Sequence, residues 1–229
     1  MRTTTSVVST ALWCVVLWIN QIEKTMEQIK QYEYIDLGLP SGLKWAKCNV
    51  GADKETDYGY YFQWGEIEPH DADTPYNWVN YKYCKGSSTT LTKYNIMGEY
   101  GTVDNKLTLD LEDDAARANM GGDWRMPTQS DFLEMLDYTD SEWVENFNGS
   151  GVNGRKFISK INGNSIFIPA SGGRLDSAFR HQGSYGLVWC SSLDAFFPID
   201  AWELYFDSDS IRTGYSFDRF FGFAVRGVL

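Results

Sequence analysis

Ala201-Trp-Glu-Leu-Tyr-Phe206 is the stretch that decides the fold, at the centre of the C-terminal region 184–228. Its residues alternate with a period of two, which is typical of a half-buried antiparallel strand. One face carries Trp202, Leu204 and Phe206, and the other carries Glu203, Tyr205 and Asp207. We therefore expect a strand over residues 201–206, with two further strands over residues 185–191 and 221–228.

The two segments that connect these strands, residues 193–200 and 208–220, are predicted to be irregular. They carry bulky apolar side chains where solvated turn residues are expected. Aromatic side chains that no strand alternation places inside are typical of a binding surface. The five phenylalanines concerned, which could instead be core residues of an insertion, are Phe196, Phe197, Phe217, Phe220 and Phe221.

The composition indicates a folded protein that does not bind nucleic acid. Of the 229 residues, 43% are hydrophobic and 16% aromatic, which is enough for a substantial core and argues against disorder. The formal net charge is -11, whereas a protein that binds phosphates needs clustered basic residues.

The cysteines and histidines predict neither a metal site nor a cofactor. The four cysteines, Cys14, Cys48, Cys84 and Cys190, have no metal-ligand spacing, and only two histidines accompany them. A disulfide between Cys48 and Cys84 and a pair of free buried thiols are both compatible with the sequence, and we favour the free thiols.

The N-terminal segment, residues 1–33, allows two interpretations. Residues 11–19 form an apolar run of the length found in signal peptides, but Arg2 is the only early positive charge and no small-residue cleavage site follows. The segment is therefore a poor signal or membrane anchor, or translated upstream sequence with the true start at Met26. We favour the second interpretation, and any membrane attachment would depend on the first.

The first half of the remaining chain is predicted to be short strands and ordered loops. Two strands joined by a turn at Pro40-Ser41-Gly42 are expected within residues 34–45, and an aromatic strand over residues 58–64. Residues 66–103 are polar, rich in turn residues and interspersed with tyrosine and tryptophan. We expect them to form a long ordered loop layer that is packed by aromatic rings.

Two helices are expected, over residues 110–118 and 129–138. Thr128 fits an N-cap with Asp131 in an acidic capping box, and the buried stripe is predicted to be Phe132, Leu133 and Leu136. The first helix begins with four acids: Asp110, Glu112, Asp113 and Asp114. They lack the spacing and the central glycine of a calcium-binding loop. We therefore interpret them as carboxylates that stabilise the helix N-terminus electrostatically.

The pair Asn162-Gly163 lies between two alternating segments, residues 156–160 and 165–169, and predicts a β-hairpin. The sequence contains no internal repeat and no low-complexity linker that would divide the chain into separate domains. We therefore expect one domain over residues 34–229, in which Trp124, Trp189 and Trp202 belong to the core.

Several motifs together resemble one family, the Fibrobacter succinogenes major paralogous domain, which is common in gut Bacteroidetes and their phages. The resemblance covers nearly all of the chain after Tyr34. The motifs are Tyr34-Ile-Asp-Leu-Gly-Leu-Pro-Ser-Gly-Leu-Lys-Trp-Ala46, Gly121-Gly-Asp-Trp-Arg-Met-Pro-Thr128, Gly163-Asn-Ser-Ile-Phe-Ile-Pro-Ala170, Gly183-Ser-Tyr-Gly186, Trp189-Cys-Ser-Ser192, Ala201-Trp202 and Gly222-Phe-Ala-Val-Arg226.

The resemblance implies an α+β, C-type-lectin-like fold related to the formylglycine-generating enzyme, with short antiparallel sheets, two helices and long ordered loops. It also implies a role as a target protein of a diversity-generating retroelement, in which adenine-directed mutagenesis rewrites a C-terminal variable region, here about 184–228. The sequence departs from the family at Cys190, where serine is commoner. The positions expected to stay fixed are Trp189, Ser191, Ser192, Ala201, Trp202, Gly222, Phe223, Val225 and Arg226.

A codon argument agrees with this interpretation. Mutation of the adenines in an AAC or AAT codon cannot produce Lys, Met, Gln, Glu or Trp, and none of these occurs in residues 193–200 or 211–221. Glu203 does not fit this pattern and is left out of the variable set. The residues predicted to contact a ligand are Leu193, Asp194, Phe196, Phe197, Ile199, Asp200, Tyr205, Asp207, Asp209, Ile211, Arg212, Tyr215, Phe217, Asp218, Phe220 and Phe221.

The sequence thus predicts a binding protein without catalytic activity, located outside the cell, on the cell surface or on a phage virion. Its expected ligand is a protein or glycan on a cell surface, and a polar rim of Asp194, Asp200, Arg212, Asp218 and Arg219 would surround the aromatic contacts. One alternative is a structural or adhesin module of a bacterial surface or fimbrial protein. A weaker one is a diverged oxidase, although the C-terminal cysteine pair and the histidine triad of such enzymes are missing.

Overall fold

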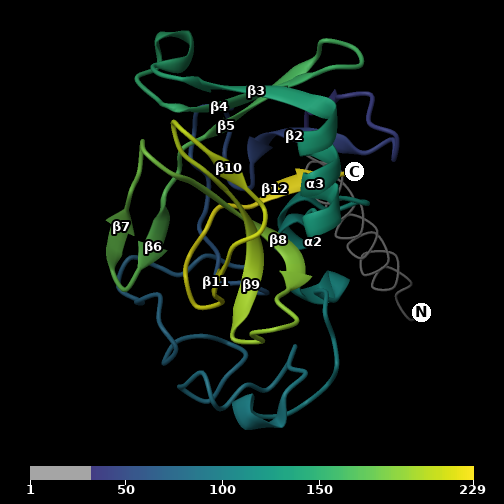
Figure 1. Ribbon diagram of the computed structural model, residues 1–229. Coiled ribbons are helices and arrows are strands. Elements are labelled where there is room, and N and C mark those ends of the chain that lie inside the picture. The colour runs from purple at the N-terminus through teal and green to yellow at the C-terminus, as the bar shows by residue number, and fades with distance from the viewer. Residues whose placement is uncertain (1–31) are drawn as a thin grey trace, which may run out of the picture. The chain divides into compact units, whose positions relative to one another are not determined.

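The computed structural model describes residues 32–229, of which Glu33–Leu229 form one compact unit with several short antiparallel sheets and two α-helices (Figure 1). The mixed α+β class is therefore as expected. The apolar run and the possible start at Met26 lie outside the described residues. Within residues 32–229, no helix combines the length and the apolar character needed to cross a membrane.

The first and last strands of the unit belong to one sheet of order β1-β2-β12. Strand β1 (Tyr34–Asp36) pairs antiparallel with β2 (Lys44–Asn49), and β12 (Arg226–Val228) pairs antiparallel with β2 on its other side. The predicted turn is present, because the amide of Gly42 donates to the carbonyl of Leu39. The last strand is shorter than predicted, since residues 222–224 make only isolated bridges.

A second sheet contains the predicted hairpin. Strands β3 (Thr139–Val144), β4 (Gly154–Ser159) and β5 (Ser165–Pro169) are antiparallel neighbours in that order. Gly163 lies in the turn between β4 and β5 with φ of +76°, a conformation that glycine adopts without steric cost. The Asn162-Gly163 prediction is therefore confirmed.

The strand predicted from the alternation is present as β9 (Asp200–Phe206), which pairs along its length with β8 (Gly186–Leu193). The segment after it is not irregular as predicted. Two short strands, β10 (Ile211–Arg212) and β11 (Ser216–Asp218), pair with opposite ends of β9 on its other edge. A separate two-stranded hairpin, β6 (Gly173–Leu175) and β7 (Ala178–Arg180), lies to one side of this sheet (Figure 1).

The second helix, α3 (Gln129–Tyr138), has the predicted bounds and the predicted capping box. The hydroxyl of Thr128 accepts from the amide of Asp131, and the Asp131 carboxylate accepts from the amide of Thr128. The predicted buried stripe is wrong at one position: Leu133 is exposed, and Met135 is buried together with Phe132.

The first helix, α2 (Ala115–Met120), begins later than predicted. Asp114 is its N-cap, and its carboxylate accepts from the amides of Arg117 and Met126. The preceding acids lie before the helix: Glu112 and Asp113 are in the 3-10 turn Leu111–Asp113, and Asp110 comes directly before that turn. Two further 3-10 turns cover Gly98–Tyr100 and Phe147–Gly149.

The long segment between β2 and α2 is the predicted loop layer packed by rings. The aromatic strand expected over residues 58–64 does not form, and only Phe62 makes a β-bridge there, to Phe223. Rings hold the layer together through edge contacts, with ring centres 5.3 Å apart for Trp64 and Tyr94 and 5.5 Å apart for Tyr83 and Tyr94. The indole N–H of Trp64 donates to the carbonyl of Cys190, which fixes the layer to β8.

Arg226 joins the first sheet to the second. Its guanidinium is fully buried and donates to the side-chain oxygen of Asn49 at 2.9 Å, to the carbonyl of Ala46 at 2.8 Å and to the carbonyl of Lys47. A fourth bond reaches the carbonyl of Phe167 on β5 at 3.1 Å. Burial lowers the pKa of Arg226 to about 10, so the group is still charged at neutral pH.

Replacement of Arg226 by methionine is expected to lower the free energy of unfolding by about 3–5 kcal/mol, because four buried acceptors lose their donor. Chemical denaturation followed by tryptophan fluorescence measures this change. The exposed Arg180→Met variant is the control and should change stability by less than about 0.5 kcal/mol. Equal losses in the two variants would show that Arg226 does not join the sheets energetically.

Candidate functional site

The residues predicted to contact a ligand surround β9 and the segments that join it to its neighbours, but they are not equally accessible. The exposed ones are Phe196 (75%), Phe197 (55%), Tyr215 (50%), Phe217 (36%), Asp209 and Arg212. Those of intermediate exposure are Ile199, Asp200, Tyr205, Asp207, Ile211, Asp218, Phe220 and Phe221.

Leu193 and Asp194 are buried, so the expectation that they contact a ligand directly is corrected. The carboxylate of Asp194 instead shapes the segment that follows it. It accepts from the amides of Phe196 and Phe197 at 2.7 and 3.3 Å and from the hydroxyl of Ser216 at 2.6 Å. The two exposed phenylalanines therefore lie on a loop whose backbone is held in place by the buried Asp194 carboxylate.

Three of the predicted residues, Tyr205, Phe217 and Phe221, line a pocket of ≈ 370 Å³ whose surface is mainly apolar. The opposite wall comes from the β6–β7 hairpin and from residues just after it, which were not predicted as site residues. The remaining lining residues are Gly173, Arg174, Leu175, Arg180, His181, Tyr185, Leu187 and Phe223. No sequence signal marked this wall, because it depends on where the eight-residue hairpin Gly173–Arg180 lies relative to β9.

The phenylalanines of the region divide into two groups. Phe196 and Phe197 are exposed, whereas Phe220 stacks on Phe221 with ring centres 4.7 Å apart and meets Trp78 edge-on at 5.1 Å. Phe217 contacts Phe221 at 5.7 Å. The two interpretations from the sequence therefore apply to different rings: the first pair can contact a ligand, and the second group also supports the fold.

A second cluster of predicted residues lies at the other end of β9. The guanidinium of Arg212 donates to the hydroxyl of Tyr215 at 2.8 Å and lies over the rings of Tyr215 and Tyr205, 5.0 and 5.9 Å from their centres. The hydroxyl of Tyr205 donates to Asp207 at 2.6 Å, and this bond is the main reason that the pKa of Asp207 falls to about 2. Asp207 also accepts from the amide of Asp209 and closes the turn between β9 and β10.

The predicted polar rim is wrong at Arg219, which is fully buried. Its guanidinium donates to the carbonyl of Tyr94 at 2.9 Å and lies 5.4 Å from the ring centres of both Trp64 and Tyr81. The cation–π contacts and the carbonyl stabilise the buried charge. Because these partners belong to the loop layer, Arg219 attaches that layer to the C-terminal region. The sequence did not indicate this role, because Arg219 is a charged residue in a segment that was predicted to be exposed.

Asp200 and Asp218 are directly opposite each other in the pairing of β9 with β11. Like charges in this position destabilise a sheet. Burial, followed by the charges of Asp218 and Asp194, raises the pKa of Asp200 to about 7, and burial raises the pKa of Asp218. Near neutral pH this edge of the candidate site therefore changes its charge.

Replacement of Asp200 by asparagine is expected to remove a pH dependence of stability. The folded-state pKa lies above the ordinary value of 3.8, so the folded protein keeps a proton that the unfolded chain has lost, and stability falls as pH rises from about 4 to about 7. At pH 8 the variant should be more stable than the wild type by about 2 kcal/mol. Thermal unfolding at pH 5 and pH 8 measures the difference, which a parallel pH profile in both proteins would contradict.

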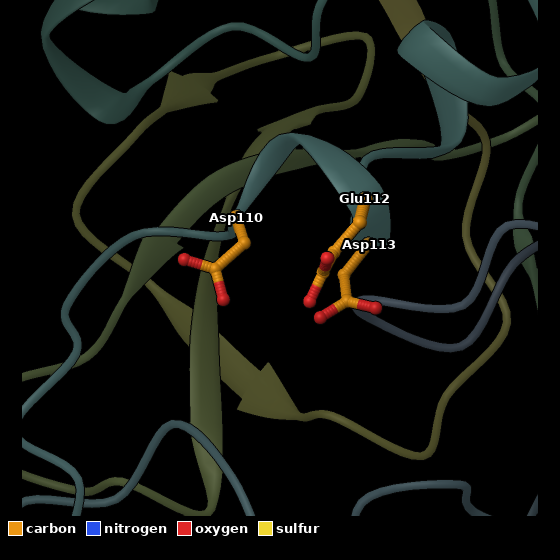
Figure 2. Close-up of side chains that lie close together, drawn as sticks. All are labelled: Asp110, Glu112 and Asp113. Carbon is orange, nitrogen blue, oxygen red and sulfur yellow. The ribbon is translucent and has the colours of Figure 1, made fainter.

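Three acids before α2 form a separate cluster with metal-ligand proximity, Asp110, Glu112 and Asp113, and Figure 2 shows their carboxylates turned toward one another. The ammonium of Lys93 bonds to all three, at 2.7 Å to Asp110, 3.2 Å to Glu112 and 2.5 Å to Asp113. Lys93 thus compensates part of the negative charge, and Lys82 on Asp113 and Lys106 on Asp110 compensate more of it. The favoured helix-terminus explanation is confirmed for Asp114, which caps the helix, and is wrong for the other three acids, which bind a side chain.

Replacement of Lys93 by methionine is expected to create a cation site that the wild type lacks. The uncompensated carboxylates should lower the free energy of unfolding by about 2 kcal/mol, and millimolar Ca²⁺ should restore part of it. Differential scanning calorimetry with and without Ca²⁺ provides the measurement. Lys106→Met is the control, since the exposed Lys106 bonds only to Asp110. Equal stabilisation of the wild type by Ca²⁺ would show that an ion displaces Lys93.

Three cysteines lie within the described residues, and none of them lines the pocket. Cys48 and Cys84 are free thiols rather than a disulfide, and both are half-buried. The thiol of Cys190 is fully buried, donates to the carbonyl of Trp202, and has a pKa raised by burial to about 12.

The fold and the site together define a mixed α+β protein with an aromatic, partly exposed surface around one central strand. Comparison of the chain with family models, with curated proteins and with solved structures finds no match.

Proposed function

We propose that this protein is a non-catalytic binding protein in which a C-type-lectin-like scaffold displays a diversified, aromatic-rich surface. Its gene is the target of a diversity-generating retroelement, and its ligand is a protein or glycan on a cell surface. The protein acts on a cell surface or on a phage virion. The proposal starts from the family resemblance of the motifs and is supported by where the structure places two sets of residues.

The observation that supports it best is the separation of frame and surface. Seven of the nine positions expected to stay fixed are buried, and only Ser192 and Trp202 have intermediate exposure. Of the sixteen positions expected to vary or contact a ligand, only Leu193 and Asp194 are buried. Variation at most of the other fourteen, with Phe220 and Phe221 as the exceptions because their rings also support the fold, would change the surface and leave the core packing intact, as a diversified binding protein requires.

A second observation is that the exposed rings are carried on ordered backbone. Asp194 fixes the backbone of Phe196 and Phe197, and Arg212 lies over Tyr215. Rigid aromatic side chains give a large contact area for a small loss of conformational entropy, as in antibody binding sites. Binding through these rings should depend little on salt concentration.

The oxidase alternative receives no support from the one thiol in the region. Such chemistry needs an accessible thiolate, whereas burial raises the pKa of Cys190 and the thiol faces the carbonyl of Trp202. The adhesin alternative uses the same exposed rings and differs in what they contact, so an experiment must separate it from the leading proposal.

Sequencing of the DNA around the gene tests the proposal. We expect a reverse transcriptase gene and an imperfect repeat of the C-terminal codons that differs only where the template has adenine. The differences should fall on exposed codons such as those of Phe196, Arg212 and Tyr215, and should spare those of Trp189, Gly222 and Arg226. Absence of the repeat would favour the adhesin alternative, and differences concentrated in buried codons would contradict the separation of frame and surface.

A further inference from the structure

Glu203 is a buried acid that supports nothing in the described structure. Only 1% of its surface is exposed, and neither carboxylate oxygen has a hydrogen-bond partner within residues 32–229. No lysine, arginine or histidine of that range lies within ion-pair distance of it. A buried polar group without a partner is costly, so its presence in the central strand requires an explanation.

The register of the sheet places Glu203 beside the aromatic pocket. Ala201, Glu203 and Tyr205 alternate along β9 and therefore leave the sheet on the same face. Leu187 is paired with Tyr205, and Phe217 is paired with Ala201, so both point to that face as well. Tyr205, Leu187 and Phe217 all line the pocket. Glu203 thus rises from the strand between the residues that form the pocket wall.

The surroundings of Glu203 favour the neutral form of the acid. Burial, with a smaller effect from Asp200, raises the pKa of Glu203 well above its usual value. A neutral carboxyl group in apolar surroundings still offers a carbonyl oxygen that accepts a hydrogen bond. The group is therefore an unpaired acceptor that lies behind the residues lining the pocket and is covered by them.

The pocket walls indicate the kind of ligand group that fits. A volume of ≈ 370 Å³ lies within the roughly 300–1,000 Å³ of small-molecule sites, and the phenylalanine and tyrosine rings favour a planar aromatic group. The walls also include Arg174 and Arg180, which would repel a cation. Arg174 lies between the rings of Tyr76 and Phe179, 4.8 and 4.9 Å from their centres. A neutral donor is therefore favoured over an ammonium group.

We propose that this pocket binds an uncharged aromatic ring system with an N–H donor, such as indole, and that the ligand moves the side chains covering Glu203 aside, so that Glu203 accepts the hydrogen bond of that donor. The rings of Phe217, Phe221 and Tyr205 contact the faces of the ligand, and Leu187 and Phe223 form the wall behind it. The inference rests on the proposed function for its biological meaning: an indole side chain of a cell-surface ligand would anchor in the pocket.

Titration calorimetry of the full chain with indole and with benzothiophene, which has the same shape but no N–H donor, tests the proposal. We expect the wild type to bind indole roughly three- to tenfold more tightly. Glu203→Met should bind benzothiophene as well as the wild type does and should lose the preference for indole, whereas Glu203→Gln should retain it. Equal affinity of the wild type for both probes would overturn the role of Glu203.

Two variants test the location of the site. Phe217→Ala removes a pocket wall and should weaken both probes, whereas Phe196→Ala removes an exposed ring that does not line the pocket and should change neither. Thermal unfolding of each variant shows whether it is folded. Failure of the folded wild type to bind either probe, or equal effects of the two variants, would overturn the pocket.

A blocked Gly-Trp-Gly peptide distinguishes a side-chain anchor from a free ring compound, because it binds only if the pocket accepts indole attached to a backbone. Indole binding without peptide binding would confine the inference to small molecules. These probes test one pocket and do not test whether the C-terminal codons are diversified, so a negative result here leaves the proposed function standing. In the same way, absence of the retroelement repeat leaves the pocket standing.

Discussion

The structure depends most on the four hydrogen bonds of one buried guanidinium. Arg226, next to the C-terminus, bonds to three residues of β2, including the carbonyls of Ala46 and Lys47, and to Phe167 on β5. Small sheets of two to four strands bury little apolar surface individually, so the connections between them determine whether the unit is cohesive. A single cation that satisfies acceptors from two sheets provides such a connection, and β12 brings it there by pairing with β2.

A second buried arginine performs the same task for the loop layer. Arg219 bonds to the carbonyl of Tyr94 and lies against two rings, and Gly222 follows where a side chain would collide with Tyr76, because a β-carbon there would lie 2.4 Å from that ring. The residues just before Arg219, and those between Arg219 and Gly222, therefore keep one side partly exposed. The candidate site is built from that side, so a rigid frame and a changeable surface alternate within a few residues of the same chain.

Local sequence signals predicted the elements that depend on local interactions. The capping box of Thr128 and Asp131 fixes the start of α3, the turn at Asn162-Gly163 fixes a hairpin, and the alternation around Leu204 identifies β9. The aromatic segment 58–64 was predicted as a strand because its residues favour strands. It has no partner strand along its length, and propensity without pairing gives only the bridge at Phe62.

The missed features of the site are those that depend on distant contacts. Strands β10 and β11 are two and three residues long and exist only through pairing with β9, so no period was available to detect them. Glu203 and Arg219 are buried although charged residues are expected at the surface. Their burial is caused by other segments that pack over them, which the local sequence does not show. The half of the pocket formed by the β6–β7 hairpin was missed for the same reason, whereas Tyr205, Phe217 and Phe221, which also line it, were predicted as contact residues from their aromatic side chains in and beside the connecting segments.

The division of one edge of β9 between two very short strands has a consequence for self-association. A long, regular and apolar outer strand would present a row of unpaired amides and carbonyls to which a neighbouring molecule could add its own strand. Here the outermost partners are too short to offer such a template, and the turn between them interrupts it. A chain that displays many aromatic rings can therefore accept further changes on its surface without becoming a nucleus for fibrous aggregates.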